Sequence, residues 1–288
     1  MREVAYAEET LHTPDGISLF LRSWLPVPDE NGAEPRATVV ICHGQGDHSG
    51  RYDHVARYFA QRGYAVYAHD HRGQGKSGGH RGHIDRFANY YDDLWLVIKT
   101  VKARQAGKKL FLIGHSLGGL IAIGYAQSRP KTINGLIASS PGLERSMHVP
   151  AIKLILGKLM LHIAPRFALN PGLQAEGLTH DPQVAAAYKA DPIREPRVTA
   201  RFYAEFEKAG RDVRRNAGAL TVPSLIMPGG DDPICSTPAT VQFYDEVSAA
   251  DKTLVVWEGM YHEIFNEIDK QKVLEVAESW VAERLASH

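Results

Sequence analysis

Residues 109–127 read KLFLIGHSLGGLIAIGYAQ, and the interpretation of the whole chain starts from this stretch. Residues 109–113 form a short apolar run bounded by polar residues, which is typical of a buried parallel strand. Residues 119–127 have the length and the small side chains of a helix packed tightly on a sheet. Between them lies Ser116 in the pattern Gly-x-Ser-x-Gly, which predicts a sharp strand-to-helix turn that exposes the serine hydroxyl.

The alternative interpretation of this turn is a glycine-rich connection with an idle serine, because the five-residue pattern also arises by chance. The strand before it and the helix after it favour a nucleophile. Glycines are needed on both sides since a Cβ there would collide with the neighbouring strand or helix. The helix N-terminus below Ser116 favours developing negative charge.

The composition is that of an ordinary globular protein. The chain has 288 residues, which suffices for one large α/β domain with an insertion, and 44% of them are hydrophobic. Lys and Arg number 33, equal to Asp and Glu, so no electrostatic field for nucleic acid is expected. Two cysteines, no signal-like N-terminus and no run of eighteen apolar residues favour a cytoplasmic protein.

Apolar runs alternate with helical patterns along the chain. Strands are predicted in a hairpin around Asp15-Gly16 and at the end of the chain, where residues 252–257 form the last one. The remaining strands cover residues 37–42, 64–69, 109–113, 134–140 and 222–229, with helices at 51–61, 86–106 and 268–285. This alternation predicts an α/β fold with a mostly parallel eight-stranded sheet flanked by helices.

Residues 143–217 interrupt the alternation because they contain no strand-like run. They include a strongly apolar helical stretch at 149–163, followed by polar helical segments with Asp-Pro breaks. We therefore expect a helical cap at 143–217, inserted between two parts of the core, 1–142 and 218–288. The apolar stretch is too short and too interrupted to span a membrane, although it could lie at an interface. For that helix alone, packing on the sheet is an equally good interpretation.

Functional groups of a parallel sheet gather at the carboxyl ends of its strands. The strand at 37–42 runs into His43-Gly44-Gln45, and a His-Gly pair in this place is typical of an oxyanion-hole loop. The backbone N–H groups of Gln45 and Leu117 are the predicted oxyanion donors. On its own, the same loop could be an ordinary glycine-rich connection.

Two further strand ends supply an acid and a base. Asp231 and Asp232 follow the strand at 222–229, and His262 lies in the loop between the last strand and the last helix. The order Ser116, Asp, His262 is that of the α/β-hydrolase fold. Asp232 is preferred because it stands beside Pro233 after a Gly-Gly-Asp turn, and Asp231 is the alternative.

Other motifs are interpreted as chance matches. Residues 73–78 fit a dinucleotide fingerprint and the end of a phosphate-binding loop, but they open no clear helix and position 70 holds Asp rather than Gly. The histidines of this region have no zinc-site spacing, so we expect them to make local hydrogen bonds: His69, His71, His80 and His83.

Taken as a set, the motifs resemble the monoacylglycerol lipase and lysophospholipase branch of the α/β-hydrolases. The resemblance covers nearly the whole chain and rests on residues 43–52, 70–77, 114–119, 229–232 and 261–262. It supports Asp232 over Asp231. One departure is Asp47, where that family commonly has Glu.

The resemblance implies a set of roles for named residues. Ser116, Asp232 and His262 would form the catalytic triad, with no metal and no organic cofactor. Asp47 and Arg51 would help to hold the oxyanion loop and the alcohol end of the substrate. The apolar cap would form the acyl tunnel, for which the candidate residues are Ile152, Ile155 and Leu156.

The expected function is hydrolysis of single-chain acylglycerols, a lipid ester substrate reached by transient contact of the cap with a membrane surface. Lysophospholipase, general carboxylesterase and thioesterase activities are alternatives on the same scaffold. A peptidase is a further one. A non-catalytic binding protein is disfavoured because a receptor needs no nucleophile, base and oxyanion loop together. The expected location is cytoplasmic, with peripheral membrane attachment as an option.

Overall fold

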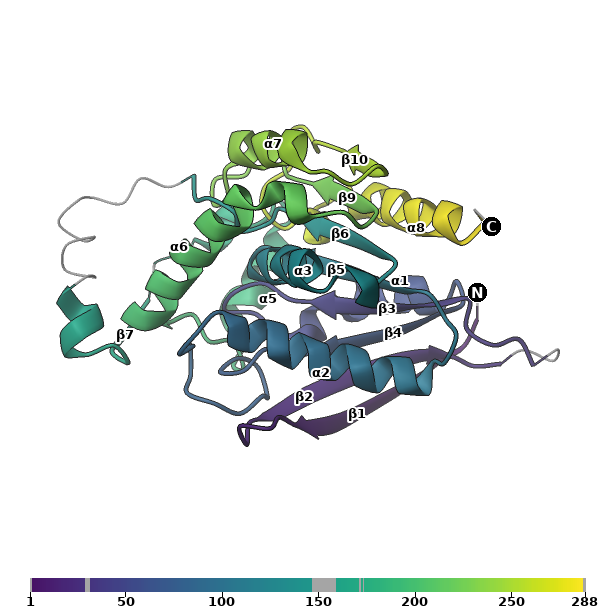
Figure 1. Ribbon diagram of the computed structural model, residues 1–288, viewed down its shortest axis with the longest axis horizontal. Coiled ribbons are helices and arrows are strands. Elements are labelled where there is room, and N and C mark those ends of the chain that lie inside the picture. The colour runs from purple at the N-terminus through teal and green to yellow at the C-terminus, as the bar shows by residue number, and fades with distance from the viewer. Residues whose placement is uncertain (1, 29–31, 147–158, 171, 173, 287–288) are drawn as a thin grey trace.

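The computed structural model describes residues 2–28, 32–146, 159–170, 172 and 174–286, and a large sheet forms its centre (Figure 1). The strands are β1 Val4–His12, β2 Ser18–Pro26, β3 Ala37–Cys42, β4 Tyr64–His69, β5 Leu110–His115, β6 Gly135–Ser139, β9 Ser224–Met227 and β10 Lys252–Leu254. Their order in the sheet is β1-β2-β4-β3-β5-β6-β9-β10. The pairs β1–β2 and β2–β4 are antiparallel and every other pair is parallel, which confirms the mostly parallel eight-stranded sheet.

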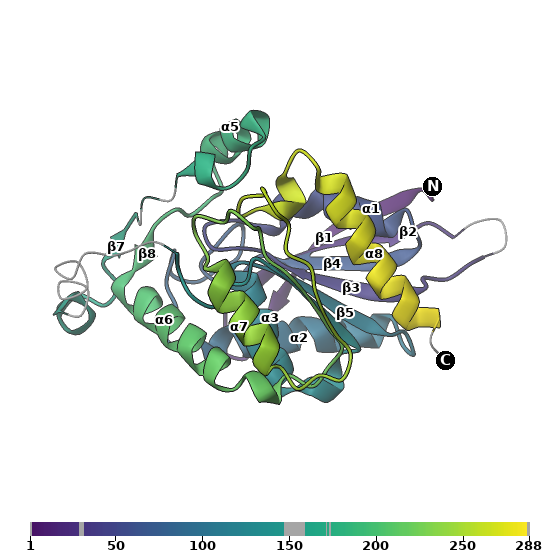
Figure 2. The same cartoon turned by 90° about the horizontal axis from the view of Figure 1, so that it is seen from above.

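Helices cover both faces of the sheet (Figure 2). Helices α1 Asp53–Ala60 and α8 Lys270–Ala286 pack on one face, and α2 Ala88–Arg104, α3 Leu117–Ser128 and α7 Thr237–Glu246 lie on the other. Each face has its own buried apolar cluster, one including Phe59 and Trp280 and the other including Leu120 and Phe243. The two-sided burial explains why the central strands read as continuous apolar runs rather than alternating ones.

The central strands, whose carboxyl ends lie next to the candidate site, are more buried than the edge strand. Every residue of β3, β4, β5, β6 and β9 is buried, whereas β1 is largely exposed at the sheet edge. The edge strand carries charged side chains such as Glu8 and Glu9, a composition that discourages pairing with another chain. The carboxyl ends of the buried parallel strands therefore form a rigid platform for the loops that follow them.

The segment between β6 and β9 contains α5 Pro182–Ala190 and α6 Ala200–Arg215, and α6 packs against α3. It also contains two short strands, β7 Ala168–Leu169 and β8 Val198–Thr199, which pair antiparallel. The prediction that residues 143–217 contain no strand is therefore wrong. Strands of two residues are too short to produce a recognisable alternation of apolar and polar side chains, so the pattern could not reveal them.

The last strand is shorter than predicted. β10 ends at Leu254, while Trp257 forms only an isolated bridge with Gly229. The Val255 N–H still donates to the Ile226 carbonyl at 3.0 Å, so the chain continues along β9 without regular pairing. Among the described residues, no helix is long and apolar enough to cross a membrane.

Candidate active site

Ser116 occupies the turn between β5 and α3 in a strained backbone conformation. Its φ is 53° and its ψ is −117°, a region that side-chain-bearing residues rarely adopt. The turn is held by a hydrogen bond from the Ser116 N–H to the Ser139 carbonyl at 3.0 Å and by one from the Gly142 N–H to the Ser116 carbonyl at 2.9 Å. This conformation is the one predicted from the glycine pattern around the serine.

The flanking glycines are required by close backbone contact. A Cβ on Gly114 would lie 2.4 Å from the Gly118 carbonyl oxygen, and one on Gly118 would lie 2.1 Å from the Cys42 carbonyl oxygen. Gly44 approaches the serine from the other side, since its Cβ would lie 3.4 Å from the Ser116 Cβ. The end of β3 and the start of α3 therefore meet at the serine.

The Asp and the His predicted from the strand ends lie together. The His262 Nδ1 and the Asp232 Oδ2 are 2.8 Å apart, and both side chains are buried. The other carboxylate oxygen of Asp232 accepts the backbone N–H groups of Ile234 at 2.8 Å and Cys235 at 2.9 Å. Asp231 is exposed instead, so Asp232 is the aspartate of the two that pairs with His262.

The charges of this pair stabilise each other. Burial acts to raise the pKa of Asp232, but His262 and the two backbone donors outweigh it and hold that pKa below its usual value. Burial acts to lower the pKa of His262, yet the Asp232 carboxylate raises it well above its ordinary 6.5. The carboxylate fixes the imidazole with Nδ1 as donor and leaves Nε2 for chemistry.

Cys235 is a neighbour of the site that the sequence analysis did not single out. Its thiol is buried, and burial raises its pKa while the neighbouring His262 and Ser116 act to lower it. One ligand atom each of Asp232, Cys235 and His262 lie within 4.8 Å of one another. The three-residue spacing of Asp232 and Cys235 could have indicated this. An aspartate carboxylate that accepts the backbone N–H three residues later folds the chain so that the later residue lies beside it.

The loop after β3 is arranged to present a backbone N–H. His43 Nδ1 donates to the Gly44 carbonyl at 2.7 Å, while its Nε2 accepts the His71 N–H at 2.9 Å. Because the carbonyl and the N–H of a trans peptide point in opposite directions, this contact turns the Gln45 N–H away from His43. The Leu117 N–H is the first of α3 and has no acceptor within the helix. Both predicted oxyanion donors thus come from elements that meet at Ser116.

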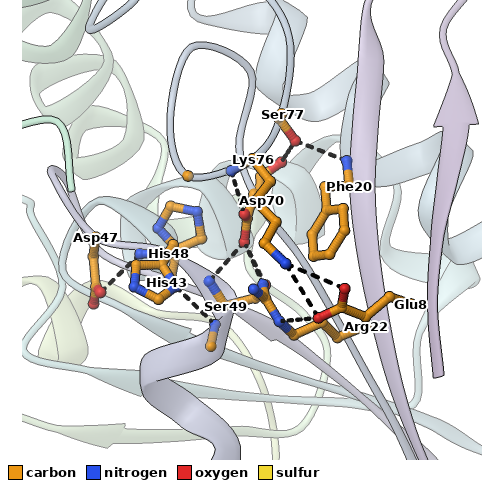
Figure 3. A network of polar contacts seen from close by, with 12 residues as sticks. Glu8, Phe20, Arg22, His43, Asp47, His48, Ser49, Asp70, Lys76 and Ser77 are labelled. Atoms are coloured by element: carbon orange, nitrogen blue, oxygen red, sulfur yellow. Dashed lines mark hydrogen bonds and ion pairs between the residues drawn. The ribbon is translucent and has the colours of Figure 1, made fainter. Parts of the chain in front are cut away.

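A second buried network anchors this loop to the strands beneath it (Figure 3). The Asp70 carboxylate accepts the Ser49 N–H at 2.8 Å, an Arg22 guanidinium N–H at 3.1 Å and the Lys76 N–H at 2.7 Å. A Cβ on Gly75 would lie 2.1 Å from an oxygen of this carboxylate. Residues 70–78 are therefore organised around an internal anion, which is opposite to what a phosphate-binding loop requires.

Asp47 and Arg51 lie at the far end of the same loop. Arg51 makes a bidentate ion pair with Glu263 at 2.9 and 2.7 Å and approaches the Asp47 carboxylate at 3.3 Å. Their role in substrate binding stays a prediction. The acyl-tunnel candidates lie outside the described residues: Ile152, Ile155 and Leu156.

The histidines of the glycine-rich region differ in their surroundings. His69 and His71 are fully enclosed and their rings stack edge to face, and burial lowers the pKa of both. His83 bonds to Thr199 and Asp85 at 2.9 and 3.1 Å. The expectation of local hydrogen bonds is therefore met only in part: His83 bonds to Asp85 nearby, but Thr199 lies 116 positions away, and neither ring nitrogen of His69 has a hydrogen-bond partner among the described residues.

Comparison with known proteins agrees with this geometry. A family model described as serine aminopeptidase, S33 matches residues 33–269. The monoacylglycerol lipase of Mycolicibacterium smegmatis is 32% identical over 94% of this chain and 95% of its own. Phospholipase YtpA of Bacillus subtilis is 34% identical over 85% of this chain and 95% of its own.

A solved structure extends the comparison to the fold. The monoacylglycerol lipase of Paleococcus ferrophilus superposes with a TM-score of 0.78 at 29% identity, over 98% of this chain and 99% of its own. The alignment covers nearly all of both chains, so the two proteins share the same fold. The chain therefore belongs to the serine aminopeptidase S33 family and, within the α/β-hydrolase fold, to the branch of monoacylglycerol lipases and lysophospholipases.

Proposed function

We propose that this protein is a serine hydrolase that cleaves the ester bond of monoacylglycerols through an acyl-enzyme on Ser116. The proposal rests on the strained backbone of Ser116 and on the buried Asp232–His262 pair joined at 2.8 Å. The ring of His115, the residue before Ser116, lies 4.7 Å from the ring of His262. The similarity to two monoacylglycerol lipases over nearly the full chain supports the choice of substrate.

In the proposed mechanism His262 acts first as a base and then as an acid. Its Nε2 takes the proton from the Ser116 hydroxyl as the oxygen attacks the ester carbonyl, and then protonates the departing glycerol oxygen. Asp232 keeps the imidazole in the required tautomer and stabilises its cation. The Gln45 and Leu117 N–H groups would hold the oxyanion, each worth ~3–4 kcal/mol by analogy with measured oxyanion holes. Water activated by His262 then releases the fatty acid.

The insertion at 143–217 would act as a cap that receives the acyl chain. Several apolar side chains of its described part are more than half exposed: Leu159, Ile163, Phe167 and Leu169. Exposed apolar side chains grouped in one segment are suited to a lipid surface. We therefore propose that the cap makes transient contact with the membrane from which a monoacylglycerol is taken.

Lysophospholipid hydrolysis is the second candidate, favoured by the similarity to Phospholipase YtpA. The two activities differ in the alcohol that leaves, glycerol in one and a glycerophospho group in the other. An aminopeptidase is the third outcome to test, because the family model carries that description.

The test is a substrate panel with a matched inactive variant. Wild type and Ser116→Ala would be assayed on 1-monoacylglycerols of increasing chain length, lysophosphatidylcholine, an acyl thioester and an aminoacyl arylamide. The proposal expects glycerol release by wild type, with a preference for medium or long chains, and none by the variant. Faster cleavage of lysophosphatidylcholine or of the arylamide would overturn the substrate assignment while leaving Ser116 as the nucleophile.

A further inference from the structure

A buried ion pair joins the two loops on which the proposed chemistry depends. Glu263 directly follows His262, and Arg51 lies in the short 3₁₀ helix Ser49–Tyr52 that continues the oxyanion loop. The Arg51 Nη1 and Nη2 atoms lie 2.9 and 2.7 Å from the two carboxylate oxygens of Glu263. The side chains are only 11% and 5% exposed, so the pair is shielded from water. Two planar groups held at two points allow little relative rotation or sliding.

The remaining contacts leave Arg51 little capacity for another ligand. Its Nη1 is also 3.3 Å from the Asp47 carboxylate, and its guanidinium carbon lies 4.7 Å from the centre of the Tyr188 ring. Glu263 accepts a further hydrogen bond from the Asn266 amide at 2.8 Å. Burial acts to raise the pKa of Glu263, but Arg51 lowers it to about 2, so this carboxylate is charged under ordinary conditions.

From these contacts we propose that Glu263 is a positioning residue, which acts through Arg51 to hold the His262 loop in register with the oxyanion loop. Arg51, engaged in this way, serves the chemistry common to all esters and does not bind the alcohol of the substrate. The inference rests on the proposed function of Ser116 and His262. It concerns their geometry and not the identity of the ester.

The physical reason lies in how the site is assembled. Gln45 follows β3 and His262 follows β10, so the oxyanion donor and the base come from strands that are not neighbours in the sheet. Both must nevertheless lie within a few tenths of an ångström of their productive places around Ser116. A buried ion pair adds little net stability compared with apolar side chains, but it does constrain geometry.

The direct test is Glu263→Gln, assayed on two esters with the same acyl chain, a 1-monoacylglycerol and a p-nitrophenyl ester. This variant leaves one buried cation, Arg51, beside one carboxylate, Asp47, which favours a folded protein. We expect kcat to fall on the order of 10- to 100-fold for both esters, as a small misplacement of reacting groups does. KM should stay within about threefold of wild type for both, because no ground-state contact is lost.

Arg51→Lys separates positioning from charge. A lysine keeps the positive charge but cannot make the two-point contact with Glu263. The proposal therefore expects a loss of kcat close to that of Glu263→Gln, on both esters. A lysine with wild-type kinetics would show that charge alone suffices and would overturn the proposal.

Arg57→Gln is the matched control. Arg57 lies two turns further along the chain, pairs with Asp53 at 2.8 Å, and both of these side chains are more than 40% exposed. Removing an exposed ion pair should leave kcat and KM unchanged on both esters. The melting temperature of each variant would be recorded, and kinetics measured well below it. The rate of inactivation by a fluorophosphonate reports Ser116 reactivity without any substrate.

Two further results would overturn the inference. If the variants impaired hydrolysis of the monoacylglycerol alone, through a higher KM, Arg51 would be a ligand of the substrate alcohol. Wild-type kcat and wild-type inactivation rates in folded Glu263→Gln would show that the pair positions nothing. If wild type cleaves the p-nitrophenyl ester but not monoacylglycerols, the substrate assignment fails, and the positioning test remains valid on the remaining ester.

Discussion

The bond between His262 and Asp232 decides which nitrogen of the imidazole is free for proton transfer. Because Asp232 holds Nδ1 at 2.8 Å, Nε2 is the ring nitrogen left for the proton transfer that we propose. Asp231 precedes it in the chain but is exposed to solvent. Only one of the two adjacent aspartates therefore pairs with His262, so substituting each in turn gives a matched pair of variants.

Asp232→Asn should lower kcat on the order of 10⁴-fold, because an amide no longer selects the productive imidazole tautomer. Asp231→Asn should leave kcat within about twofold, as expected for an exposed side chain remote from the proton path. Steady-state hydrolysis of a p-nitrophenyl ester measures both. Equal losses in the two variants would contradict the assignment of Asp232.

The pH dependence follows from the raised pKa of His262. Protonated imidazole cannot accept the Ser116 proton, so kcat/KM falls as the pH drops through the pKa of the folded protein. Since Asp232 raises that pKa well above 6.5, the acid-side half-maximum should lie above pH 6.5. A kcat/KM profile measured from pH 5 to pH 9 tests this expectation. A half-maximum below pH 6.5 would mean that Asp232 does not stabilise the imidazolium.

At the scale of elements, the strand–turn–helix around Ser116 is defined by backbone packing. Gly118 lies under the carbonyl oxygens of Cys42 and His43, at the point where α3 meets β3. Backbone atoms of a central strand cannot move aside as a flexible side chain can. The turn is therefore coupled to the oxyanion loop through contacts that leave no room for a methyl group.

Gly118→Ala should destabilise the protein by about 3 kcal/mol, the upper end of the range for overpacking, because its Cβ would lie 2.1 Å from the Cys42 carbonyl. Gly78→Ala is the control, since its nearest neighbours would be at an ordinary 3.4 Å. Urea unfolding followed by circular dichroism measures the difference. Equal stability of the two variants would show that α3 and β3 can separate without cost.

The elements that could be predicted are those in which many consecutive residues are buried and therefore apolar. Strands β3 to β6 are buried on both faces and appear as apolar runs, and Ser116 was found from the glycines that its turn demands. The pair β7–β8 and the early end of β10 depend on backbone contacts with distant residues. Such contacts leave no periodic pattern in the side chains.

The same distinction applies to the site. Asp232 and His262 could be placed because they follow strand ends, where groups of a parallel sheet gather. The partnership of Arg51 and Glu263 joins residues 212 positions apart, and no local signal indicates it. Cys235 reaches the site through a turn whose geometry is set by the Asp232 carboxylate.

At the scale of the whole molecule, α6 packs on the buried core beside α3, whereas β7 lies at one end of the molecule (Figure 1). Figure 1 places β7 at the end of the molecule opposite to both termini. The neighbouring Ile163 is 69% exposed. An apolar side chain so exposed contributes little to folding, so Ile163 is a suitable place to test the membrane contact that we propose.

Ile163→Glu should reduce the fraction of protein that sediments with phosphatidylcholine vesicles, because the charge must leave water to enter the interface. Hydrolysis of a water-soluble short-chain ester should stay unchanged. Ile268→Glu is the control, since Ile268 is 68% exposed but lies outside the insertion. Equal vesicle binding by the two variants would show that the cap does not contact the membrane.

A covalent label shows whether Ser116 is the nucleophile that we propose. The protein would be treated with a fluorophosphonate and the adduct located by mass spectrometry of its peptides. We expect one adduct per chain, on the peptide that contains Ser116, and none in Ser116→Ala. An unlabelled wild-type protein, or the same adduct in the variant, would show that Ser116 is not the nucleophile.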